Sequence, residues 1–85
     1  MRKENKKMEL EIEERLQLKY KNLIVEVNYK EIRKYEIVIK LEDKGVTYES
    51  KFEYLYDAHL TFDANINIIV SKIDRIILSY YKKGE

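Results

Sequence analysis

The sequence predicts an α+β domain of the order αβββα, in which a long C-terminal helix packs on one face of a three-stranded antiparallel meander. Two observations predict this fold. Three segments between residues 23 and 54 alternate apolar and polar residues with period two, which is typical of half-buried strands. From Thr61 to Lys83 there is no Gly or Pro, and apolar residues recur every three or four positions, which is typical of a helix. We expect residues 1–85 to form one domain, with residues 1–5 frayed.

The N-terminal segment carries two competing signals. Apolar residues alternate with glutamates from Met8 to Glu13, which favours a strand. The composition of residues 6–20, rich in Glu, Lys, Leu and Arg and without a turn residue, favours a helix. The side chains that would share one helical face are Met8, Ile12, Leu16 and Tyr20. We favour the helix and keep the strand as the alternative.

The three strands are expected to be joined by short turns. Their inner rows run in steps of two from Leu23 to Tyr29, from Tyr35 to Leu41 and from Val46 to Tyr54. Asp43-Lys44-Gly45 predicts a tight hairpin, because glycine adopts the positive φ that such turns require. The short link of residues 30–34 predicts a second hairpin. The open edges of this meander offer a route to dimers by strand addition.

The C-terminal helix is expected to cover the inner face of the sheet. Thr61 is its expected N-cap, and Asp63 is favourably placed against the helix dipole. Lys82 and Lys83 lie at the C-terminal end, where positive charge is favoured, and Gly84 can end the helix. The expected buried stripe is Phe62, Ile66, Ile69, Ile73, Ile76 and Tyr80, widened by Val70 and Ile77.

Composition restricts the classes of function. The chain has no Cys, which excludes disulfides and thiolate metal sites and fits a reducing compartment. The net charge is +1, so non-specific nucleic-acid binding is disfavoured. The charged N-terminus argues against a secretory signal, and no stretch approaches the ~20 apolar residues of a membrane span. We expect a cytoplasmic protein without membrane contact.

Chemistry-bearing residues are sparse. His59 is the only histidine, with Asp57 and Asp63 nearby. We interpret His59 as a loop residue beside an Asp57 that caps backbone amides; the alternative, a metal- or His-dependent enzyme, depends on His59 alone. The two glycines, Gly45 and Gly84, form no phosphate-binding loop. We therefore expect no enzyme, cofactor, metal or small-molecule substrate.

A partner-binding face is expected on the C-terminal helix. Ile68 and Leu78 fall outside the buried stripe and should face solvent. The candidate contact residues for a protein partner, a second copy in a homodimer, or RNA are Ile68, Lys72, Arg75, Leu78, Lys82 and Lys83. The strand tyrosines are interpreted as part of the pleated surface, with an aromatic contact patch as the alternative. The expected function is non-enzymatic protein binding as a small regulator or inhibitor, of the kind that mobile elements encode.

The stretch from Phe62 to Ile77 resembles, without gaps, the last helix of the ribosome hibernation-promoting factor family. The matching positions are Phe62, Ala64, Ile66, Lys72, Ile73, Asp74, Arg75 and, beyond the stretch, Tyr80. The three strands and the hairpin at residues 43–45 are also similar, so the resemblance covers residues 22–83. The family's opening strand has no counterpart before residue 8, and Asn65, Asn67 and Ser71 replace typical Ala and Asp positions.

This resemblance implies an alternative function. It implies binding to the small ribosomal subunit through Lys72, Arg75, Lys82 and Lys83, which would silence translation. The double-stranded RNA-binding domain shares the αβββα order, but the basic motif at the start of its last helix is not found in this sequence.

Overall fold

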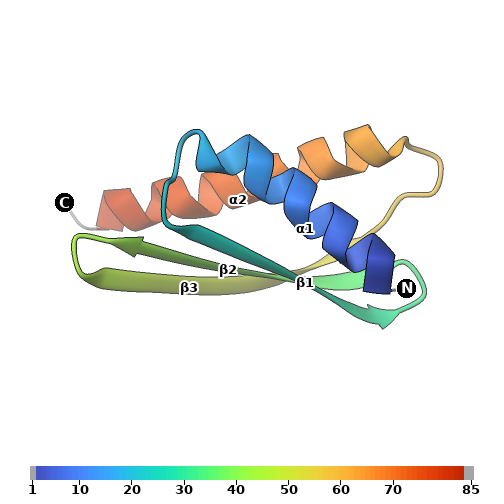
Figure 1. Cartoon of the computed structure of the whole chain (residues 1–85), viewed down its shortest axis with the longest axis horizontal. Coiled ribbons are helices and arrows are strands. Elements are labelled where there is room, and N and C mark those ends of the chain that lie inside the picture. Colours follow the sequence, from blue (N-terminus) through green and yellow to red (C-terminus); the bar gives the residue numbers. More distant parts are fainter. Residues whose placement is uncertain (1, 84–85) are drawn as a thin grey trace.

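The computed structural model describes the backbone of residues 2–83 and the side chains of residues 5–82 (Figure 1). Its elements are α1 (Arg2–Gln17), β1 (Leu23–Glu31), β2 (Lys34–Asp43), β3 (Val46–Leu55) and α2 (Phe62–Lys83). The predicted αβββα order is confirmed, and the N-terminal segment is a helix and not a strand. Both helices lie on the same face of the sheet (Figure 1). The predicted stop at Gly84 and the side chain of Lys83 lie outside the described residues.

The strands form an antiparallel meander in the order β1-β2-β3. The β2–β3 register is continuous from Lys34 opposite Leu55 to Asp43 opposite Val46, whereas the β1–β2 register shifts between Tyr29 and Glu31. The predicted hairpin between β2 and β3 is confirmed. Its two central residues, Lys44 (φ 52°) and Gly45 (φ 80°), both have positive φ, as a type I′ turn requires.

The core lies between the two helices and the inner face of the sheet. The α1 stripe of Met8, Ile12 and Leu16 is buried as predicted. On α2 the fully buried apolar residues are Ile66, Ile69, Ile73 and Ile77. Ile77 therefore lies at the centre of the stripe, and Phe62, Ile76 and Tyr80 pack along its margin. Val46, expected on the inner row of β3, is exposed because it lies at the strand end beside the turn.

Polar side chains join α1 and its C-terminal turn to α2. Arg15 donates to Asp63 at 2.8 Å and also to Asn67. The Tyr20 hydroxyl donates to Asp74 at 2.5 Å, and Lys19 pairs with the same carboxylate at 3.2 Å. The hydrogen bond from Tyr20, together with the charge of Lys19, lowers the pKa of Asp74. Burial and the same hydrogen bond raise the pKa of Tyr20 to about 12.

Helix α1 also closes one edge of the sheet. β1 is an edge strand, so the outward-facing amides of its backbone have no neighbouring strand. Glu9 accepts a hydrogen bond from the Val27 amide at 2.9 Å, and Glu13 accepts one from the Val25 amide at 3.3 Å. Two glutamates that the sequence pattern places beside the apolar stripe therefore satisfy two of the amides at the β1 edge.

Candidate binding cleft

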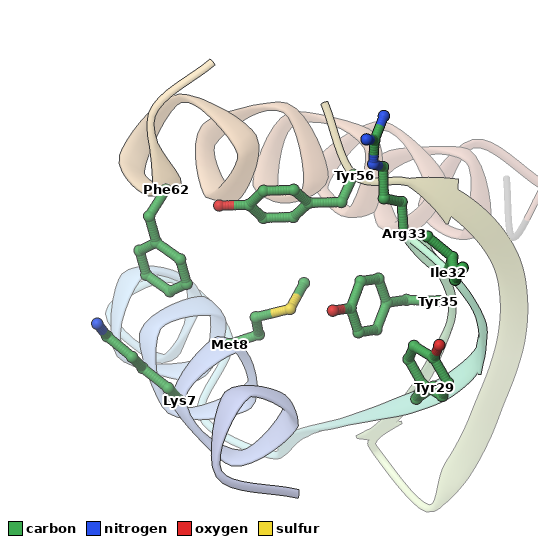
Figure 2. A pocket seen from close by; sticks show the side chains of 8 residues that line it. All are labelled: Lys7, Met8, Tyr29, Ile32, Arg33, Tyr35, Tyr56 and Phe62. Atoms are coloured by element: carbon green, nitrogen blue, oxygen red, sulfur yellow. The ribbon is translucent and has the colours of Figure 1, made fainter. Parts of the chain in front are cut away.

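A cleft of about 470 Å³ opens at the end of the molecule where the β1–β2 turn meets the N-terminal half of α1 and the start of α2 (Figure 2). Three separate parts of the chain line it. The lining residues are Lys7, Met8, Tyr29, Ile32, Arg33, Tyr35, Tyr56 and Phe62. Packing of the helices on the sheet brings these segments together.

Aromatic rings form most of the walls. The rings of Tyr29 and Tyr35 meet edge to face with centroids 5.8 Å apart, and Tyr35 meets Tyr56 in the same way at 6.4 Å. Figure 2 shows the hydroxyl of Tyr35 directed toward Met8, and that of Tyr56 directed toward Phe62. Edge-to-face rings leave an apolar hollow with hydroxyl groups at fixed positions. The cleft therefore suits an apolar side chain that ends in, or lies beside, a polar group.

Two cations flank this hollow. The Lys7 ammonium lies 4.7 Å from the centroid of the Phe62 ring, close enough for a cation–π contact. The Arg33 stem lines the cleft, and its guanidinium extends away from the cavity past Tyr56 (Figure 2). Among the described residues, no carboxylate forms an ion pair with either side chain. The mouth of the cleft thus carries positive charge that is available to an acidic partner.

The β1–β2 turn holds Arg33 in an uncommon conformation. Its φ is 62°, in the left-handed region where residues other than Gly, Asn and Asp are rare. Its carbonyl accepts a hydrogen bond from the Tyr56 amide at 2.6 Å, which ties the turn to the segment after β3. Backbone strain of this kind persists where the surrounding structure fixes it, and it is frequent at binding sites.

The opposite rim is fixed by Asn65, which is fully buried in the first turn of α2. Its side-chain oxygen accepts hydrogen bonds from the Tyr54 hydroxyl and the Asp57 amide. Its side-chain nitrogen donates to the carbonyls of Asp57 and Thr61. Thr61 caps the helix as predicted, because its hydroxyl accepts a hydrogen bond from the Ala64 amide at 3.0 Å. These bonds fix the loop between Tyr56 and Phe62, the two residues that line the cleft on this side.

A shallower depression adjoins the cleft and exposes two aliphatic side chains. It shares Ile32, Arg33 and Tyr56 with the cleft and adds Leu55, Asp57 and Ala58. Ile32 is 79% exposed and Leu55 is 68% exposed. Exposed aliphatic residues that cluster beside an aromatic cleft are typical of a contact surface, whereas single ones are common anywhere.

The described residues of the predicted contact face lie along the exposed side of α2. Ile68 and Leu78 are both exposed, by 44% and 51%, as expected. They are ten positions apart in the sequence, which places them about 15 Å apart along the helix and about 80° apart around it. The contact face on α2 stays a prediction. Arg75, Lys82 and Lys72 are all exposed, and the Lys72 ammonium lies 5.3 Å from the centroid of the Phe52 ring on β3.

His59 lies exposed in the loop before α2. Its backbone amide donates to the Asp57 carboxylate at 2.9 Å, so Asp57 caps an amide as the sequence predicts. Within residues 5–82 there is no group of three or more His, Asp or Glu side chains that could hold a metal ion. In the described part of the chain, no helix combines the length and the apolar character needed to cross a membrane.

The cleft was not predicted as a site. The sequence predicts Tyr29, Tyr35 and Tyr56 only as tyrosines in or near strands, with an aromatic contact patch as the alternative. The signal that could have located the cleft is Ile32, an apolar residue in a turn whose other four residues are all charged. An apolar residue at the tip of a charged hairpin has no core to enter, so its exposure is predictable.

Comparisons of the chain with protein-family models, with curated proteins and with solved structures find no match. The resemblance to hibernation-promoting factors therefore stays a prediction.

Proposed function

We propose that this chain is a small, non-enzymatic, cytoplasmic module that regulates or inhibits a protein partner by direct binding. The observation that carries the proposal is the aromatic cleft with the exposed side chains of Ile32 and Leu55 beside it. Interface cores are enriched in aromatic residues and Arg, and anchors that insert into preformed pockets contribute most of the binding energy.

The chemistry of the cleft favours a particular partner segment. Its apolar hollow accommodates one large aliphatic or aromatic side chain. Lys7 and Arg33 attract acidic residues on either side of that anchor, and such charge complementarity raises the association rate. We therefore propose a partner segment that combines an apolar anchor with flanking Asp or Glu.

The proposal is tested by affinity capture from a host lysate with matched surface variants. Ile32→Glu changes the cleft, and Ile24→Glu places the same charge at a residue that is 54% exposed on β1. Arg33→Glu is matched by Lys44→Glu, because both residues have positive φ in two-residue turns. Capture of the same protein by the wild type and both controls, with loss in both cleft variants, is the expected result.

Two other outcomes would contradict it. Loss of capture only in an Ile68→Glu/Leu78→Glu variant would assign binding to α2 instead of the cleft. Recovery of small ribosomal subunits in a salt-sensitive manner would favour the hibernation-type function. The far-ultraviolet circular dichroism of each variant verifies that the fold is retained.

A further inference from the structure

The two edge strands of the sheet differ in how their outward-facing backbone amides are hydrogen-bonded. The amides of Val25 and Val27 at the β1 edge bond to glutamates of α1. At the β3 edge, no side chain described in the structure accepts a hydrogen bond from a backbone amide of Val46–Leu55. β3 is ten residues long, and it pairs with β2 without a bulge. A long, regular and uncovered edge is a template for another strand.

The ladder determines which residues of β3 face outward. The amide of Val25 points away from β2, so Val25 and its partner Ile39 form a non-hydrogen-bonded pair. The backbone amide and carbonyl of Ile39 therefore point toward β3, where they form hydrogen bonds with the backbone of its partner, Ser50. Because successive residues alternate, the amides and carbonyls of Glu49 and Lys51 point to the free edge. By the same alternation, the backbone groups of Thr47 and Glu53 also point to the free edge.

The sequence of this edge is complementary to itself. An antiparallel copy related by a two-fold axis at Ser50 places Glu49 opposite Lys51 of the partner, and Lys51 opposite the partner's Glu49. Both pairs fall on hydrogen-bonding positions of the new ladder, and both side chains are exposed on the face that the helices leave open. On the helix-covered face, Tyr48 meets Phe52 of the second copy. Opposite charges and aromatic pairs across strands are stabilising.

Neighbouring registers are less favourable. An axis at Lys51 places two lysines opposite each other and Glu49 opposite Glu53. An axis at Phe52 shortens the paired segment. It also places Lys51 opposite Glu53 of the second copy, but Glu53 already forms an ion pair with Lys34 at 3.5 Å. Glu49 and Lys51 form no ion pair with the residues that the structure describes. The axis at Ser50 also pairs nearly the whole of β3.

We propose that two copies of this chain associate through β3, antiparallel and centred on Ser50, to form a continuous six-stranded sheet. This interface is separate from the cleft residues used to test the proposed function, so either proposal can fail alone. The partner is a second copy because the charge pattern Glu49-Ser50-Lys51 complements its own reverse.

Charge exchange tests the interface. Lys51→Glu places glutamates opposite each other twice in the dimer, and Glu49→Lys does the same with lysines. Each variant should raise the dimer dissociation constant by about tenfold or more. A mixture of the two variants restores both Glu–Lys pairs and should form heterodimers with about wild-type affinity. Glu26→Lys, on the exposed face of the opposite edge strand, is the control and should not change self-association.

The measurement is sedimentation equilibrium across a concentration series, in which the dimer has twice the 10.4 kDa mass of the single chain. A wild-type chain that stays at 10.4 kDa at its highest soluble concentration overturns the proposal. A dimer that both charge variants leave unchanged, or that the mixture fails to restore, overturns it as well.

A cysteine at the proposed axis tests the register. The chain has no Cys, so Ser50→Cys introduces a single thiol. In a non-hydrogen-bonded pair the Cα atoms lie about 4.5 Å apart, within the range that disulfides span. Mild oxidation should cross-link Ser50→Cys into covalent dimers and leave Ser71→Cys, on the exposed surface of α2, largely monomeric. Equal cross-linking of the two variants, or none at residue 50, contradicts the register.

Discussion

The Tyr54 hydroxyl donates a 2.5 Å hydrogen bond to the side-chain oxygen of Asn65, joining the end of β3 to the first turn of α2. Tyr54 is buried and Asn65 is fully buried. Burial, with the charge of Asp57 as a further cause, raises the pKa of Tyr54. The Asn65 side chain also holds both polar groups of the Asp57 backbone, so one side chain sets the position of the loop between Tyr56 and Phe62, two residues that line the cleft.

Replacement of Asn65 should be among the most destabilising polar substitutions. Asn65→Ala removes four hydrogen bonds and leaves the buried Tyr54 hydroxyl without this acceptor, which should cost about 2–4 kcal/mol. Tyr54→Phe leaves the other three bonds in place and should cost only about 1 kcal/mol. Urea unfolding measures both. Equal losses for the two variants would show that the Asp57 and Thr61 bonds contribute little.

Stability should fall in acid through Asp74. Its pKa is lowered from the ordinary 3.8 in the folded chain, chiefly by the Tyr20 hydrogen bond, so the unfolded chain binds a proton first as pH falls. The stabilising contribution of the carboxylate is therefore complete above the unfolded pKa and is lost as pH falls through the folded pKa. The free-energy difference between the wild type and Asp74→Asn should shrink below about pH 4. A constant difference across this range would contradict the linkage.

An alkaline loss of stability should come from Tyr20. Its pKa rises from 10.0 to about 12 on folding, so the unfolded chain loses the hydroxyl proton first. The contribution is fully present below pH 10 and declines as pH rises toward 12. The free energies of unfolding of the wild type and of Tyr20→Phe should therefore converge or cross between pH 10 and pH 12. The control is Tyr29→Phe, at a tyrosine that lines the cleft and not the contact between the helices.

Substitution of Gly45 should act through the backbone alone. A Cβ atom added at Gly45 would meet no heavy atom within 4 Å, whereas its φ of 80° is unfavourable for an L side chain. Gly45→Ala should therefore cost about 1–2 kcal/mol. Gly45→Asn should cost less, because Asn adopts positive φ more readily. If the two variants are equally stable in urea unfolding, the cost has another origin.

Removal of the glutamates at the β1 edge should have two effects. Glu9→Ala/Glu13→Ala leaves the amides of Val25 and Val27 without their acceptors and should cost about 1–3 kcal/mol. It also exposes a second sheet edge, so the variant should form assemblies larger than any formed by the wild type. Light scattering after size-exclusion chromatography measures the second effect. A Glu11→Ala/Glu14→Ala variant, with the same change of charge on α1, should not form larger assemblies.

The fold was predictable because its determinants are local. The period-two pattern of β1 to β3 and the helical stripe of α2 depend only on neighbouring residues. For α1 the composition and the four-residue spacing of Met8, Ile12 and Leu16 favoured the helix, which the structure confirms. The predicted capping by Thr61 is also confirmed, since a cap depends on residues three positions away.

The site was not predictable by the same means. The cleft is formed by residues near 7, 32 and 56, and only tertiary packing determines that they meet. In the sequence, Asn65 stands out only as a departure from a family pattern, because a helical period does not reveal its partners on β3 and in the preceding loop. Arg33 gave no turn signal, since it occupies a left-handed position without being Gly or Asn.

The meander also sets how fast this chain folds. Each strand pairs with its sequence neighbour, and α1 contacts mainly the strand that follows it, so few loops longer than a hairpin need to close before stable contacts form. We expect refolding on the millisecond timescale or faster, with a nucleus in the β2–β3 hairpin and late docking of α2.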